Sequence, residues 1–128
     1  MTDMPPASAK ILYIEDNAEN RLLIRRVLEA EGYTVILAPN AKDGVARAMA
    51  DPPDLILMDI NLPETDGYTT TAQIKATPGL EGIKVVALTA NVMKGDREKT
   101  LAAGCDGYIQ KPIDVDQLPR QIARYLES

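Results

Sequence analysis

The sequence has 128 residues, with 19 acidic and 14 basic side chains, a formal net charge of −5, one cysteine and no histidine. This length predicts one domain with a sizeable core, and the negative charge argues against nucleic acid as a partner, because phosphate contacts need a basic patch. A single cysteine excludes an internal disulfide, and the absence of histidine excludes His-based triads and His-ligated zinc.

The N-terminal half begins with a tail and then alternates between apolar runs and amphipathic segments. Residues 1–8 are polar, contain two prolines and are expected to be a disordered tail ahead of one domain at 9–128. Strands are predicted over 11–14 and 33–37, and each is followed by an asparagine that suits a helix N-cap, Asn17 and Asn40. Gly32 closes the first helix.

The C-terminal half continues the alternation. Buried strands are predicted over 55–58 and 85–88, and a short last strand over 108–109. The helices between them are a threonine-rich one at 68–76 and a poor one at 93–103 with few large apolar side chains. A capping box of Asp114 and Gln117 is predicted for the final helix, and its buried stripe is Leu118, Ile122 and Leu126. Pro119 implies either that this helix starts late, near Asp116, or that its first turn is distorted.

Strand and helix therefore alternate about five times with short connections. This pattern predicts an α/β fold, a flavodoxin-like (βα)5 doubly wound parallel sheet with strand order 2-1-3-4-5 and helices on both faces. No apolar run is long enough to cross a membrane, and the first residues have no signal-peptide core, so we expect a cytoplasmic protein without membrane attachment.

Polar residues follow four of the predicted strands, and these strand ends should meet at one edge of the sheet: Glu15 and Asp16, Asp59, Thr89, and Lys111. Three carboxylates in one cleft repel each other, and a hard cation relieves that repulsion. Oxygen-only ligands favour Mg²⁺, to which the backbone carbonyl of Asn61 could add another oxygen. Lys111 and Thr89 would then neutralise an anion attached at Asp59, which is the equipment of phosphoryl transfer to a carboxylate nucleophile.

The chain resembles the receiver domain of two-component response regulators, from about residue 9 to its end. The motifs that carry the resemblance are Glu15-Asp16-Asn17, Met58-Asp59 to Asp66-Gly67, Leu88-Thr89-Ala90 and Lys111-Pro112. The segments 93–96, Gly104-Cys105 and Tyr108-Ile109 further resemble DivK-type single-domain regulators.

The resemblance implies a phosphorylation-dependent switch without a DNA-binding output domain. Asp59 would take a phosphoryl group from a phosphohistidine on a histidine kinase or phosphotransfer protein, and the chain would catalyse this transfer and its own dephosphorylation. Asp16 would bind Mg²⁺ directly and Glu15 through water, while Thr89 and Lys111 would contact the phosphoryl oxygens. Thr89 and Tyr108 would act as the switch toward a downstream target protein, in a monomer or weak dimer.

Several other interpretations stay open. The chain could be a receiver module excised from a hybrid histidine kinase, or an interaction module that is never phosphorylated. A phosphatase with an aspartate nucleophile is disfavoured, because its second aspartate would fall at Asn61. Lys111 is expected at an exposed strand end, where its replacement would leave stability nearly unchanged. The arginines of the first helix are expected on a solvated face, and Cys105 is expected to be a buried, unreactive residue.

Overall fold

The structure is a computed structural model that describes residues 9–60, 62, 67–89 and 94–127. Within these residues, one sheet of five parallel strands has the order β2-β1-β3-β4-β5. The strands are β1 (Lys10–Ile14), β2 (Thr34–Ala38), β3 (Leu55–Asp59), β4 (Lys84–Thr89) and β5 (Gly107–Gln110). The helices are α1 (Ala18–Glu29), α2 (Ala41–Ala50), α3 (Gly67–Ala76), α4 (Lys94–Ala102) and α5 (Leu118–Glu127). The predicted fold class and strand order are confirmed.

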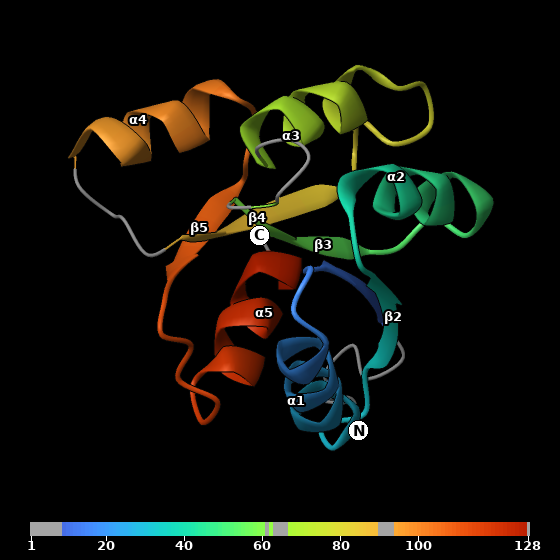
Figure 1. Cartoon of the computed structure of the whole chain (residues 1–128), viewed down its shortest axis with the longest axis vertical. Helices are drawn as coiled ribbons and strands as arrows, with labels where there is room; N and C mark the ends of the chain where they lie inside the picture. The colour runs from blue at the N-terminus through green and yellow to red at the C-terminus, as the bar shows by residue number, and fades with distance from the viewer. Residues whose placement is uncertain (1–8, 61, 63–66, 90–93, 128) are drawn as a thin grey trace.

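The helices cover both faces of this sheet. Figure 1 shows α1 and α5 on one face and α2, α3 and α4 on the other. Two buried hydrophobic clusters fill the two spaces between sheet and helices. No helix in the described part of the chain is long and apolar enough to cross a membrane.

Burial along each strand follows its place in the sheet. All five residues of the central strand β3 are buried, as a strand covered on both faces requires. The edge strand β2 is exposed at its first residue and only partly buried at the next three. The continuous apolar run before Asp59 therefore identified the centre of the sheet correctly.

The first two helices begin at the predicted asparagines. The side chain of Asn17 accepts a hydrogen bond from the Asn20 amide at 2.8 Å, and Asn40 accepts one from Asp43 at 2.8 Å. Gly32, beyond the end of α1, has φ of 97°, a left-handed conformation that glycine adopts without strain. These three positions end or start helices as the sequence predicted.

The start of α5 differs from the prediction, because no capping box forms between Asp114 and Gln117. Asp114 instead closes a turn: its side chain accepts from the Asp116 amide at 3.0 Å, and its carbonyl accepts from Gln117 and Leu118. This turn leaves Gln117 ahead of the helix, which begins at Leu118. Pro119 then lies in the first turn, where a missing N–H costs nothing.

Gly67 lets the start of α3 pack directly on the end of β3. A Cβ atom at this position would lie 2.9 Å from the Asp59 carbonyl oxygen and 2.9 Å from the Ile60 Cα. The Gly67 amide also donates to the Ile60 carbonyl at 3.0 Å. The Ile60 Cδ1 atom is also close, at 2.8 Å, and it belongs to a side chain that can move. The other two neighbours are backbone atoms, so they cannot rotate away from an added methyl group.

We therefore expect Gly67→Ala to lower the free energy of unfolding by about 1–3 kcal/mol, as overpacking usually does. Gly82→Ala is the matched control, because a Cβ there has no atom within 4 Å. Urea unfolding measures both variants. Equal stability of Gly67→Ala and the parent chain would contradict the proposed close approach.

Candidate functional site: an acidic cleft at the carboxyl ends of the strands

The sheet brings the predicted residues to a single edge. Asp59 is the last residue of β3, Thr89 ends β4, and Lys111 directly follows β5, while Glu15 and Asp16 directly follow β1. Because β1 and β4 are the two neighbours of β3, the Asp59 carboxylate lies between the other strand ends. This is the edge at which doubly wound sheets bind ligands.

Three carboxylates converge there. Glu15, Asp16 and Asp59 each offer an oxygen, and these oxygens all lie within 4.8 Å of one another. Glu15 and Asp59 are buried, whereas Asp16 is exposed. Three hard oxygen donors at this spacing, one of them open to solvent, fit Mg²⁺, which keeps part of its water shell. Asn61, the predicted source of a fourth oxygen, lies outside the described residues.

Glu15 is held at both carboxylate oxygens. The Tyr13 hydroxyl donates to Oε1 at 3.0 Å, and the Asn17 amide donates to Oε2 at 3.2 Å. Burial raises the pKa of Glu15 to about 7, and the neighbouring Asp59 charge acts in the same direction, while the Asn17 amide opposes it. A bound cation would favour the ionised form of this carboxyl group.

Lys111 is the cation on the opposite side of Asp59. Its Nζ lies 2.9 Å from Asp59 Oδ1, and its backbone amide donates to the Thr89 carbonyl at 2.8 Å. The exposed fraction is 26% for the Lys111 side chain and 3% for Asp59. The expectation of an exposed lysine is therefore wrong, because the ammonium group is drawn inward by a buried carboxylate. The Lys111–Pro112 peptide bond is cis.

The two predicted switch residues lie on neighbouring strands. Thr89 is 4% exposed, and Tyr108 on β5 pairs in register with Ala87 of β4. Ala87 belongs to the hydrophobic cluster on the α2–α4 face, and Tyr108 packs against the same cluster. Since residues two apart share a face of a strand, Thr89 lies on that face as well.

Two contacts at the site involve residues whose roles the sequence did not predict. The Arg21 Nη1 donates to the Glu15 carbonyl at 2.6 Å, so this arginine belongs to the site region and not to a purely solvated face. The sequence indicated only that Tyr13 lies in the first strand, but its hydroxyl donates a hydrogen bond to the Glu15 carboxylate. Cys105 is buried as predicted, and burial raises the pKa of its thiol, which keeps it unreactive.

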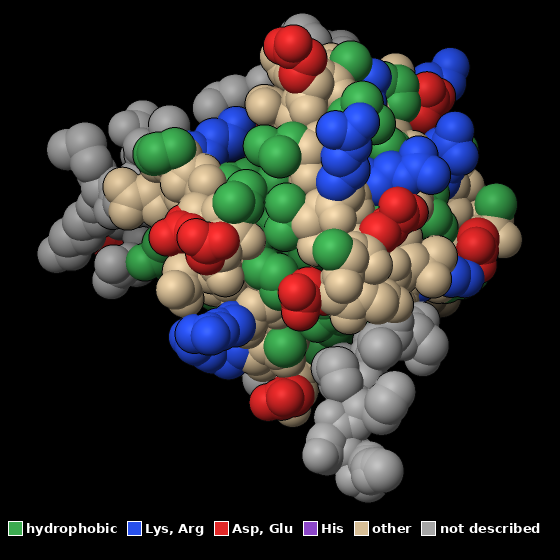
Figure 2. All heavy atoms as spheres, turned by 90° about the horizontal axis from the view of Figure 1, so that it is seen from below, with side chains coloured by type: hydrophobic (Ala, Val, Ile, Leu, Met, Phe, Trp, Pro, Cys, Tyr) green, Lys and Arg blue, Asp and Glu red, His purple; other side chains and the backbone are tan. Residues whose placement is uncertain are grey.

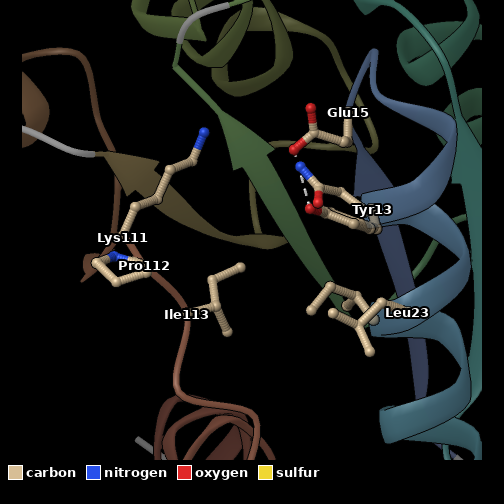
Figure 3. Close-up of a pocket in the computed structure, with 8 residues that line it drawn as sticks. Tyr13, Glu15, Leu23, Lys111, Pro112 and Ile113 are labelled. Carbon is tan, nitrogen blue, oxygen red and sulfur yellow. Dashed lines mark hydrogen bonds between the residues drawn. The ribbon is translucent and has the colours of Figure 1, made fainter.

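A cavity of about 310 Å³ opens beside the carboxylates. Figure 3 shows Glu15 and Tyr13 on one side of it and Lys111 on the other. Leu23 of α1 and Ile113, ahead of α5, form apolar walls. The site therefore combines an acidic cleft, one lysine and an adjoining space large enough for a partner's side chain.

Fold and site together define a class of protein: a doubly wound α/β domain with an acidic cleft at its topological switch point. Residues 11–123 match the family described as the response regulator receiver domain. The chain belongs to this family, whose members act in two-component signalling.

Individual relatives agree with this assignment. The polar-differentiation response regulators DivK of Brucella anthropi and Brucella ovis are 42% and 41% identical over 116 residues, which is 91% of this chain and 94% of each relative. Among solved structures, one relative is the receiver domain of the sensor histidine kinase PA1611 from Pseudomonas aeruginosa, which contains a magnesium ion in its active-site cleft. It is 38% identical to this chain, and the two structures superpose with a TM-score of 0.85. The match covers 94% of this chain and 99% of the PA1611 domain. Vibrio cholerae CheY4, 23% identical, shares the fold with a TM-score of 0.88 over 92% of this chain and 98% of its own.

The ion pair between Lys111 and Asp59 leads to a prediction about the free energy of unfolding. In metal-free protein, Lys111→Met should lower the free energy of unfolding by about 1–3 kcal/mol, because the buried Asp59 carboxylate loses its charged partner. The same substitution in an Asp59→Asn background should cost much less, and urea unfolding of the four proteins measures the difference. An equal loss in both backgrounds would mean that Lys111 stabilises by packing and not through Asp59.

Proposed function

We propose that Asp59 accepts a phosphoryl group from a phosphohistidine on a partner protein, and that this modification switches the chain between two signalling states. The observation that carries the proposal is a buried carboxylate with a lysine ammonium at 2.9 Å and two further carboxylates within 4.8 Å. These 128 residues contain no histidine, so the phosphohistidine donor lies outside them. Receiver domains as a family accept phosphoryl groups from histidine kinases.

Asp16 and Asp59 are the residues proposed to hold Mg²⁺ directly, with the Asn61 carbonyl, while Glu15 acts through water. The donor set supports this arrangement, since Asp16 is exposed and both Glu15 oxygens already accept hydrogen bonds from the protein. When bound, the ion supplies positive charge that offsets the charge of the transferring phosphoryl group. The family binds Mg²⁺ at an acidic pocket of this kind.

The transfer step needs positioning more than covalent chemistry from the protein. A carboxylate oxygen of Asp59 forms a bond to phosphorus as the phosphorus–nitrogen bond of the donor breaks. The donor ring carries a proton on its other nitrogen, so it takes the bonding electron pair and leaves as neutral imidazole. Lys111 is proposed to move from the Asp59 carboxylate to an oxygen of the attached phosphoryl group, and Thr89 to donate its hydroxyl to another. Attack by water on phosphorus later releases phosphate, which resets the switch.

The phosphodonor is proposed to approach over α1 and the cavity beside the carboxylates. Leu22 and Leu23, neighbours on α1, are 48% and 49% exposed and offer apolar area on the surface of this helix. Figure 2 views the molecule from the side of α1 and α5, and hydrophobic side chains gather at the centre of this face between charged ones. A partner helix that covered these leucines could present its phosphohistidine to the cavity without changing the fold.

The signal is proposed to leave through α4, β5 and α5. Thr89 moves toward the phosphoryl oxygens, and Tyr108 fills the space left behind it. Among the described side chains of α4, Thr100 is buried and its hydroxyl lies 3.4 Å from the Tyr68 hydroxyl, whereas Leu101 is 56% exposed. A downstream protein would recognise this surface, and the net negative charge disfavours nucleic acid in that role.

Both a stand-alone regulator and a receiver module of a sensor kinase remain compatible with this chemistry. The first is supported by the 42% identity to a DivK protein, and the second by the 38% identity to a receiver domain of a sensor histidine kinase. In either case we propose that the exchange takes place in the cytoplasm and that the protein is a monomer or weak dimer.

Phosphorylation is testable with a small phosphodonor and Mg²⁺. We expect one acid-stable, base-labile phosphoryl group per chain, measured by mass spectrometry before and after mild base. Asp59→Asn should abolish it, and Asp16→Asn should reduce it strongly because the cation loses a ligand. Asp116→Asn, which alters an exposed aspartate in the turn before α5, is the control and should label normally. A label that persists in Asp59→Asn would refute the assignment.

The switch is testable by NMR with beryllofluoride as a stand-in for the phosphoryl group. We expect large amide shifts at Thr89, in α4 and at Tyr108, besides those at the site, because the hydroxyl of Thr89 carries the change across β4. In Thr89→Ala the remote shifts should vanish while the local ones remain. Shifts confined to the loops around Asp16, Asp59 and Lys111 in the parent chain would rule out this relay.

A further inference from the structure

Tyr13 is a polar residue in a part of the sheet that is otherwise apolar. It lies in β1 between β2 and β3, where it pairs in register with Leu37 and Leu57, and it is fully buried. The other buried residues of β1 are Ile11, Leu12 and Ile14. Burial of a hydroxyl group is costly unless it forms a hydrogen bond, so a tyrosine here needs a partner.

The hydrogen-bond partner of the Tyr13 hydroxyl is the Glu15 carboxylate, which belongs to the acidic cleft. Residues two apart lie on the same face of a strand, so the Tyr13 ring extends along β1 toward Glu15. The hydroxyl donates to Glu15 Oε1 at 3.0 Å, and Figure 3 shows this bond beside the cavity. The Asn17 amide holds Oε2 at 3.2 Å, so one carboxylate is oriented from both sides.

We propose that Tyr13 is a positioning residue for the metal site, because its hydroxyl fixes the Glu15 carboxylate in the orientation from which Glu15 supports Mg²⁺ through water. This inference rests on the proposed function. Tyr13 does not touch the metal itself; it acts only through Glu15.

The electrostatics of the pair agree with this role. Burial, and after it the charge of Glu15, raises the pKa of Tyr13 far above its usual range, so the hydroxyl remains a donor. A donor to the carboxylate favours its ionised form, which is the form that attracts a cation. Without the hydroxyl, Glu15 would keep the desolvation of its site and lose one of the two bonds that compensate for it.

The test is a double-substitution cycle on Mg²⁺ affinity, measured by calorimetric titration of the unphosphorylated chain. Tyr13→Phe removes only the hydroxyl and keeps the ring in the core. We expect it to weaken Mg²⁺ binding by about 10-fold, the lower end of the range for residues that hold metal ligands in place. In a Glu15→Gln background the same substitution should change the affinity less than about twofold, because the charge on which Tyr13 acts is gone.

Tyr33→Phe is the matched control. Tyr33 is buried in the same hydrophobic cluster as Tyr13 and is 5% exposed, and we place it outside the metal site. Removal of the Tyr33 hydroxyl in Tyr33→Phe should leave the Mg²⁺ affinity unchanged. Urea unfolding of each variant without metal shows that the proteins compared are folded.

The outcomes separate this inference from the proposed function. An unchanged affinity in Tyr13→Phe, or an equal loss in the parent and Glu15→Gln backgrounds, would overturn the role of Tyr13 while Mg²⁺ binding by the parent chain still supports the proposed function. A parent chain that binds no Mg²⁺ would overturn both. A loss seen only when Glu15 is present supports the positioning role.

Discussion

Repulsion among three carboxylates is the constraint on which the rest of the site depends. A parallel sheet brings its carboxyl ends to one edge, and this sequence places an acidic residue at the end of both β1 and β3, with Asp16 beside them. Their oxygens lie within 4.8 Å of one another, and two of the groups are buried. Such a cluster is stable only when positive charge or hydrogen-bond donors compensate for it. In the described structure Lys111 supplies the charge, and Tyr13 and Asn17 supply donors.

The same constraint explains how a site can bind a cation and still accept an anion. A divalent cation bound at the cluster would relieve the repulsion among the carboxylates. A phosphoryl group on Asp59 would convert one negative centre into another, larger one with more acceptor oxygens. Lys111 could then move from the Asp59 carboxylate to the new oxygens, which lie within reach of its flexible side chain. The ion pair of the resting protein thus keeps the lysine ready for the modified state.

Most of the fold could be predicted from the sequence, because its signals are local or continuous. The fully apolar run before Asp59 identified the central strand, and Asn17 and Asn40 marked helix starts. The prediction of a capping box at Asp114 was wrong. The Asp114 side chain instead accepts from the Asp116 amide, and the Gln117 amide donates to the Asp114 carbonyl in a tight turn. Glu15, Asp16, Asp59 and Lys111 lie close together as expected, because the topology makes the ends of parallel strands meet at one edge. The exposure of Leu23 and the partial burial of Lys111 could not be predicted, because each depends on what the folded chain places beside it.

The two sides of the Asp59 site are held by different kinds of contact. A change of charge at Asp59 should therefore move atoms on one side more than on the other. On the β1 side, Glu15 is held by the Tyr13 hydroxyl and the Asn17 amide, and its carbonyl by Arg21 at 2.6 Å. On the β4 and β5 side lie the buried Thr89 at the end of β4, a lysine on a flexible chain and, further out, the half-buried Tyr108. A network with every polar group held resists displacement, whereas long or partly exposed side chains can adopt a second arrangement. Phosphorylation should therefore displace atoms toward β4, β5 and α4, while the α1 side keeps the shape that a phosphodonor has to recognise.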